Sequence, residues 1–185
     1  MAYLANCGSV TCDKYNIASA KWFKIDQKGL RYNAETNVTD WAQNDLCMFS
    51  KLFSQHLGAE SKSFHHLSFS FLDNGGNASV TIPSNLAPGN YLMRHEIIAL
   101  HSATTLMPAE FSSNCVQLRV SGSGTGVPEN KDLVRFPGGY NDNDPGLYDP
   151  QASVSDQNFG RYVFPGPPLA IFQVVDSNAN YSNST

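Results

Sequence analysis

The stretch Ala87-Pro-Gly-Asn-Tyr-Leu-Met-Arg-His-Glu-Ile-Ile-Ala-Leu-His-Ser-Ala103 decides the fold. Its first four residues favour a turn, because glycine and proline adopt turn conformations and interrupt regular pairing. The residues from Tyr91 to His101 are rich in aromatic and β-branched side chains, which favour a strand. A strand entered through a tight turn is typical of antiparallel β proteins.

Further strands are predicted on both sides of this stretch, at residues 21–25, 78–82, 116–120 and 162–164. No convincing amphipathic helix appears, and glycine and proline separate the strand signals. The chain is therefore predicted to be all-β, an immunoglobulin- or fibronectin-like antiparallel β-sandwich with long loops. From Val127 onward the composition is typical of a loop, so we expect a long ordered loop across one face.

Length and charge limit the function. With 185 residues the chain can bury one core, and we expect a single domain over 1–185 that is monomeric. Only 15% of the residues are charged and the formal net charge is -4, which argues against nucleic acid as a partner. Apolar runs such as residues 97–100 are far too short to cross a membrane.

Several features point outside the cell. Triplets for N-glycosylation begin at Asn37, Asn77, Asn180 and Asn183, although the first residues do not resemble a signal peptide. The cysteines fit neither a zinc site nor a Cys-x-x-Cys redox motif, and a local disulfide between Cys7 and Cys12 is favoured. This conflict leads us to expect that the natural N-terminus lies upstream of Met1.

The quoted stretch is also the most specific part of a family resemblance. Supporting motifs are Tyr3-Leu-Ala-Asn-Cys7 with Cys12, Lys21-Trp-Phe-Lys-Ile-Asp26, Ser79-Val-Thr-Ile-Pro83, Phe136-Pro-Gly-Gly-Tyr140 and Tyr162-Val-Phe-Pro-Gly-Pro-Pro168. Together they resemble the fungal lytic polysaccharide monooxygenases of auxiliary activity family 9. The resemblance implies a secreted, copper-dependent enzyme that hydroxylates C1 or C4 of cellulose or a related β-1,4-glucan.

The resemblance also implies a ligand set for copper: the amino group and side chain of an N-terminal histidine, a second histidine and an axial tyrosine. Both histidines would lie upstream of Met1, and Ser112 stands at the position of the tyrosine. We therefore expect an N-terminally truncated sandwich that lacks its first strands and does not bind copper tightly. By the same match, His101 and Glu110 occupy positions that contact oxygen species near copper.

Exposed tyrosines grip cellulose in this family, because aromatic faces cover sugar rings at low entropic cost. Tyr148 and Tyr162 are the candidates here, although Tyr140 and Tyr162 could equally anchor a loop. The alternative function is a non-catalytic carbohydrate-binding or structural sandwich that has lost the metal. Ser112 and the missing histidines motivate this alternative.

The other histidines have structural interpretations. His95 and His101 share a strand face but stand about 20 Å apart, too far to bind one metal ion. Arg94 and Glu96 share the opposite face and can form an ion pair. Adjacent His65 and His66 would point to opposite faces, so a metal site there is not expected.

Residues 47–72 do not match their surroundings and fall outside the resemblance. They are either a variable surface insertion or, as we prefer, a translated intron, since excising them restores the family spacing. In the family the cysteine at the position of Cys115 pairs with one nearer the N-terminus. Because that partner is missing here, Cys115 is predicted to be unpaired.

Overall fold

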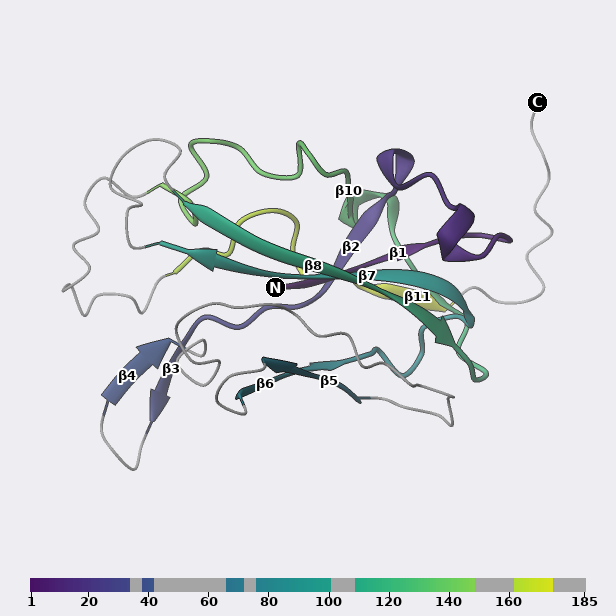
Figure 1. The fold of residues 1–185 in the computed structure, drawn as a ribbon, viewed down its shortest axis with the longest axis horizontal. Coiled ribbons are helices and arrows are strands. Elements are labelled where there is room, and N and C mark those ends of the chain that lie inside the picture. Colours follow the sequence, from purple (N-terminus) through teal and green to yellow (C-terminus); the bar gives the residue numbers. More distant parts are fainter. Residues whose placement is uncertain (34–37, 42–65, 72–75, 101–108, 149–161, 175–185) are drawn as a thin grey trace.

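The computed structural model describes residues 1–33, 38–41, 66–71, 76–100, 109–148 and 162–174. Its main element is an antiparallel sheet of five strands in the order β10-β2-β1-β7-β8 (Figure 1). The strands are β1 (Ala2–Asn6), β2 (Trp22–Asp26), β7 (Gly89–Ala99), β8 (Glu110–Val120) and β10 (Leu133–Val134). The deciding stretch thus supplies β7, which lies inside the sheet between β1 and β8.

Smaller pairs of strands complete the described fold. They are β3 (Leu30–Asn33) with β4 (Val38–Trp41), β5 (His66–Phe71) with β6 (Gly76–Thr81), and β9 (Gly126–Pro128) with β11 (Phe172–Val174). Three single 3-10 turns are described, η1 (Cys12–Lys14), η2 (Ile17–Ser19) and η4 (Asn130–Asp132). None of the helices in the described part of the chain is long and apolar enough to cross a membrane.

The main sheet buries a different cluster on each face, because side chains alternate along a strand. One face carries Leu4, Phe23 and Met93, which pack with Val80 and Ile82 against the smaller sheets. This is the interior of a β-sandwich. The opposite face carries Tyr3, Trp22 and Leu92, and here Phe136 and Tyr140 from the long loop after β10 pack on the sheet.

Most of the predicted strands are present, and one is not. Residues 162–164 have no strand pairing; Tyr162 instead donates a hydrogen bond from its hydroxyl to the carbonyl of Gly146. Prolines at 165, 167 and 168 follow directly and remove the backbone donors that a ladder needs. Within the stretch predicted to be a loop, Phe136 and Tyr140 lie on one face of the sheet, as expected, but β10 and β11 in the same stretch form short strands that the prediction missed.

Candidate functional site

The family-matched positions lie at the end of the sheet where β7 ends and β8 begins. The antiparallel register places Ala99 opposite Glu110 and Ile97 opposite Ser112. Because Glu110 and Ser112 are two residues apart, they share the sandwich-side face of β8, and both are exposed. His101, the third member of the predicted set, lies outside the described residues.

His95 lies on the same face but farther from this end. It is opposite Asn114, four positions from the Ala99–Glu110 pair, or about 13 Å along the strand. The pKa of His95 is lowered to about 4, mainly because burial disfavours the charged imidazolium, so the ring is neutral near pH 7. A neutral, buried imidazole is compatible with a structural role for His95.

No cluster of three or more histidine, cysteine, aspartate or glutamate side chains that could hold a metal ion occurs among the described residues. The side chains at the strand end are a carboxylate and a hydroxyl, Glu110 and Ser112. Copper prefers imidazole and amine nitrogen ligands, and the one described imidazole on this face is the distant His95. The described residues therefore do not fit a copper centre.

The other face of β7 holds a buried ion pair. The guanidinium of Arg94 donates to Glu96 Oε2 over 2.8 Å, and Glu96 is fully buried. The second carboxylate oxygen accepts a hydrogen bond from the hydroxyl of Tyr140, whose oxygen lies 2.9 Å from that of Tyr3. The predicted ion pair between Arg94 and Glu96 is confirmed, whereas its tyrosine partners were not predicted.

Burial and the neighbouring carboxylate raise the pKa of Tyr140 far above its ordinary value, and burial likewise raises the pKa of Tyr3. Both phenols are therefore neutral in the physiological range and can donate hydrogen bonds. Aromatic contacts close this cluster: Arg94 lies 4.9 Å from the ring centre of Phe136, and Phe111 stacks on Tyr140 at 5.6 Å. The result is a polar cluster that joins the long loop to the sheet.

Lys24 on β2 is also fully buried beneath the loop segments. Its ammonium donates to the carbonyl of Pro165 over 2.8 Å and to Gln27 Oε1 over 3.1 Å. Burial lowers the pKa of Lys24 to about 8, and the charges of Glu96 and Asp144 oppose that shift. Through the Pro165 carbonyl, Lys24 holds the segment 162–168 against the sheet. Hydrogen bonds within the chain thus account for the burial of its ammonium group.

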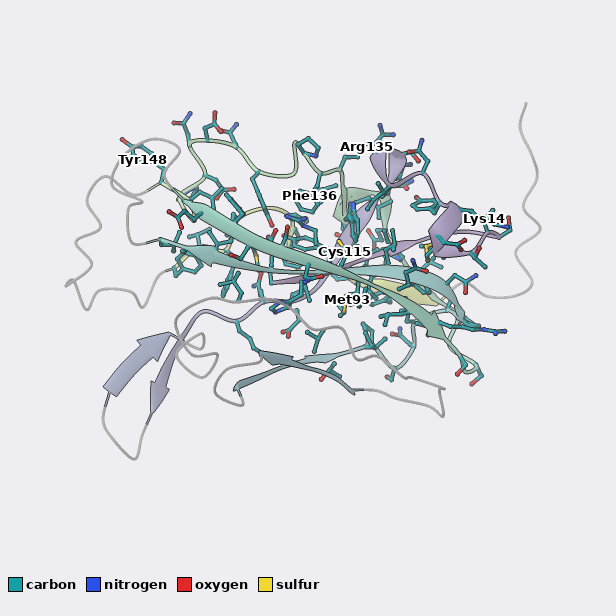
Figure 2. The ribbon with its side chains drawn as sticks, viewed as in Figure 1. Lys14, Met93, Cys115, Arg135, Phe136 and Tyr148 are labelled. Carbon is teal, nitrogen blue, oxygen red and sulfur yellow. A yellow bond between two sulfur atoms is a disulfide. The ribbon has the colours of Figure 1, made fainter. Side chains whose placement is uncertain are left out.

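Tyr148 and Tyr162, the predicted contacts to polysaccharide, have different surroundings. Figure 2 shows Tyr148 at the end of the molecule where β8 begins, opposite the end that carries Lys14. Tyr148 is half-buried, and its backbone N–H donates to the carbonyl of Asp144 over 2.9 Å. The ring of Tyr162 packs edge-on against Phe164 at 5.0 Å, and its hydroxyl donates to the carbonyl of Gly146, two residues before Tyr148.

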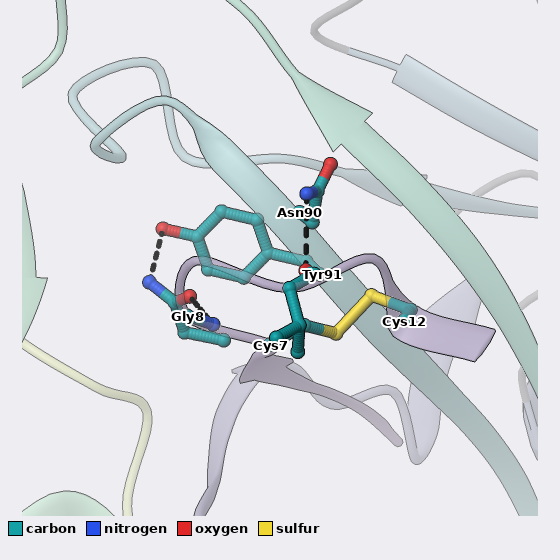
Figure 3. The surroundings of a disulfide bond; sticks show 7 residues. Cys7, Gly8, Cys12, Asn90 and Tyr91 are labelled. Atoms are coloured by element: carbon teal, nitrogen blue, oxygen red, sulfur yellow. Dashed lines mark hydrogen bonds between the residues drawn. A yellow bond between two sulfur atoms is a disulfide. The ribbon is translucent and has the colours of Figure 1, made fainter. Parts of the chain in front are cut away.

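The cysteines of the described region follow the prediction. Cys7 and Cys12 form a disulfide, with Cα atoms 5.4 Å apart (Figure 3). The N–H of Cys7 donates to the carbonyl of Asn90 over 2.8 Å, which ties this loop to the start of β7. Cys115 is a free, half-buried thiol whose pKa is raised by burial.

Comparison with known proteins gives the family. The sequence model of Auxiliary Activity family 9 (formerly GH61) matches residues 1–159, and the chain belongs to this family. It is 42% identical to the AA9 family lytic polysaccharide monooxygenase D of Gloeophyllum trabeum over 177 residues, which cover 96% of this chain and 41% of that protein. It is 33% identical to the AA9 family lytic polysaccharide monooxygenase-like protein CEL1 of Agaricus bisporus, over 90% of this chain and 43% of that protein. The chain thus spans less than half the length of these two curated relatives.

Solved structures agree with this assignment. HiLPMO9B superimposes with a TM-score of 0.64 and 31% identity, covering 91% of this chain and 61% of that one. A cellulose-active polysaccharide monooxygenase from M. thermophila gives a TM-score of 0.64 and 27% identity, with coverages of 93% and 64%. The predicted family and the predicted β-sandwich are confirmed.

Proposed function

We propose that the protein to which this chain belongs cleaves cellulose or a related β-1,4-glucan by oxidation at C1 or C4. Membership of the family over residues 1–159 carries this proposal. The M. thermophila relative, described as cellulose-active, supports cellulose as the substrate. The position of Glu110 beside Ser112 on the exposed end of β8 supports this end of the sheet as the reacting end.

Within this proposal the residues have separate roles. His101 and Glu110 hold and orient oxygen species by hydrogen bonding, as their family positions imply. Tyr148 and Tyr162 serve the polysaccharide side of the site, Tyr148 as an aromatic contact and Tyr162 through its hydrogen bond to the carbonyl of Gly146. Ser112 supplies a hydroxyl where the family resemblance implies the axial tyrosine.

Copper is the cofactor that the resemblance implies, and the described residues do not fit it. A single imidazole at His101 with a nearby carboxylate at Glu110 captures Cu(II) loosely, since copper leads the affinity order for such ligands. Loose capture does not create the fixed geometry that oxygen activation needs. This chain by itself is therefore proposed to be inactive.

The second candidate is a non-catalytic carbohydrate-binding sandwich, and Ser112 is the observation that favours it. The two functions are separated by extending the chain at Met1 with the corresponding N-terminal segment of the Gloeophyllum trabeum relative. Products from cellulose with a reductant are then analysed for both forms. Oxidised oligosaccharides from the extended form alone support the enzyme; binding to cellulose without products from either form supports the non-catalytic alternative.

Secretion and glycosylation belong to the same proposal. Of the four glycosylation triplets, the one at Asn77 falls in the described region, on β6 opposite Ser70. Expression in a eukaryotic secretory host, followed by glycosidase treatment and mass analysis, tests this point. An unmodified secreted chain would remove the glycoprotein part of the proposal.

A further inference from the structure

The turn that leads into Tyr148 is held by one aspartate. Asp144 Oδ1 accepts from the N–H of Gly146 over 3.2 Å, and its carbonyl accepts from the N–H groups of Leu147 and Tyr148 over 2.8 and 2.9 Å. Leu147 is buried, with 8% of its surface exposed. The backbone of Tyr148 is thereby fixed although its side chain lies at the rim of the molecule.

A second segment of the chain closes on this turn. Asp144 Oδ2 accepts from the N–H of Gly166 over 3.3 Å, and the hydroxyl of Tyr162 donates to the carbonyl of Gly146 over 2.9 Å. The two segments touch so closely that a Cβ added to Gly146 would lie 2.2 Å from the carbonyl oxygen of Val163. The turn therefore has little freedom to move away from residues 162–166.

The ring of Tyr162 faces the interior of this contact. It packs edge-on against Phe164, and both rings lie over Gly29, where an added Cβ would be 3.5 Å from Tyr162 Cδ1 and 2.8 Å from Phe164 Cζ. Tyr162 is half-buried, and these contacts occupy part of its ring. Its hydroxyl, in contrast, reaches the turn that carries Tyr148.

We propose that Asp144 and Tyr162 are positioning residues, which hold Tyr148 rigidly at the rim as the aromatic contact for a β-1,4-glucan chain. The inference rests on the proposed function for the identity of the ligand. An aromatic side chain on a backbone that is already fixed loses less entropy on binding than one on a backbone that must first be ordered. Tyr162 acts through the Gly146 carbonyl and makes no contact of its own with the polysaccharide.

The test uses the full chain, adsorbed to microcrystalline cellulose at equilibrium, with the variants Tyr148→Ala, Tyr162→Phe and their double mutant. Tyr162→Phe keeps the ring and removes only the hydroxyl, and we expect it to weaken adsorption about two- to tenfold. If Tyr162 acts through Tyr148, the double mutant binds no more weakly than Tyr148→Ala. Multiplied losses in the double mutant would overturn the proposal, as would unchanged adsorption of Tyr162→Phe.

A matched control is Tyr91→Phe, at the other end of β7. Tyr91 also donates its hydroxyl to a carbonyl over 2.9 Å, that of Ala87, so this variant removes an equivalent bond away from Tyr148. Its adsorption should equal that of the unmodified chain. A loss as large as that of Tyr162→Phe would show a general effect of destabilisation and would contradict the positioning role.

A second readout needs no polysaccharide. In chain labelled with 3-fluorotyrosine, the ¹⁹F resonance of Tyr148 is assigned by its loss in Tyr148→Phe. Tyr162→Phe and Asp144→Ala should shift and narrow this resonance, because the ring of Tyr148 gains freedom. Asp144→Asn keeps one acceptor oxygen and should change the resonance less than Asp144→Ala does. A changed resonance without any adsorption of the unmodified chain would count against the proposed function alone. An unchanged resonance would overturn the positioning role whatever the adsorption.

Discussion

The hydroxyl of Tyr140 donates a hydrogen bond to the fully buried carboxylate of Glu96, joining the long loop to strand β7. The two residues are 44 positions apart in the sequence. Arg94 neutralises the same carboxylate, and Phe111 and Phe136 enclose the ring of Tyr140. This contact keeps the loop that carries Tyr148 against the sheet.

Replacement of Tyr140 by phenylalanine removes the hydroxyl and leaves a buried carboxylate oxygen without its donor. We expect the free energy of unfolding to fall by about 1–3 kcal/mol, the usual cost of an unsatisfied buried polar group. Urea denaturation at pH 7 measures it. Tyr15→Phe, at a half-buried tyrosine directly after η1 that keeps its ring on the same cluster, is the control and should change stability by less than about 0.5 kcal/mol. Equal stability of the two variants would contradict the role of Tyr140.

His95 should make the protein sensitive to acid. Its folded pKa of about 4 lies below the unfolded value of 6.5, so the unfolded chain binds the extra proton first as the pH falls. Stability is therefore lost between pH 6.5 and 4, by up to about 3 kcal/mol. The unfolding temperature measured against pH should fall less steeply in this range for His95→Gln. Parallel curves for the two proteins would show that His95 does not carry the effect.

Lys24 should produce the same direction of pH dependence at alkaline pH. Its folded pKa of about 8 lies below the unfolded value of 10.5, so the folded state gives up the proton first and stability rises with pH from about 8. Denaturation at pH 7 to 9.5 compares the chain with Lys24→Met, because the buried tyrosines titrate above this range. As the pH rises, the free energy of unfolding of the unmodified chain should increase relative to that of Lys24→Met. A constant difference would refute the prediction.

We expect residues 47–72 to be dispensable for the core. Excision also removes β5 (His66–Phe71), the strand paired with β6, so this prediction requires that Val80 of β6 keep its place in the buried cluster on the sandwich face without that partner. A chain without residues 47–72 should unfold at the same or a higher temperature, and sequencing of the transcript should find this stretch removed from the dominant mRNA. A dominant mRNA that retains the codons for residues 47–72 would contradict the intron hypothesis.

Local sequence was sufficient to predict the parts of the fold that depend on neighbouring residues. Strand alternation placed Arg94 and Glu96 on one face within reach of each other, and short spacing indicated the Cys7–Cys12 disulfide. Residues 162–164 have strand-forming side chains but are held by a hydrogen bond to a distant turn, which overrides their propensity.

The positioning contacts could not be predicted because they join segments that are remote in sequence. Nothing in the residues around Tyr140 marks Glu96 as its partner, and an Asp-Pro-Gly turn at 144–146 signals a bend without indicating that Gly166 closes on it. Glu110, assigned by its spacing to Cys115, is the first residue of β8 and lies opposite Ala99. The roles assigned to His101, Glu110, Tyr148 and Tyr162 stay predictions.

The most direct test of the account is calorimetric titration of this chain with Cu(II), followed by product analysis on cellulose with a reductant. The described residues hold no metal cluster, and Ser112 stands where the family resemblance implies a tyrosine ligand. We therefore expect weak binding, with no oxidised oligosaccharides. Nanomolar affinity together with C1- or C4-oxidised products from this chain would contradict the account.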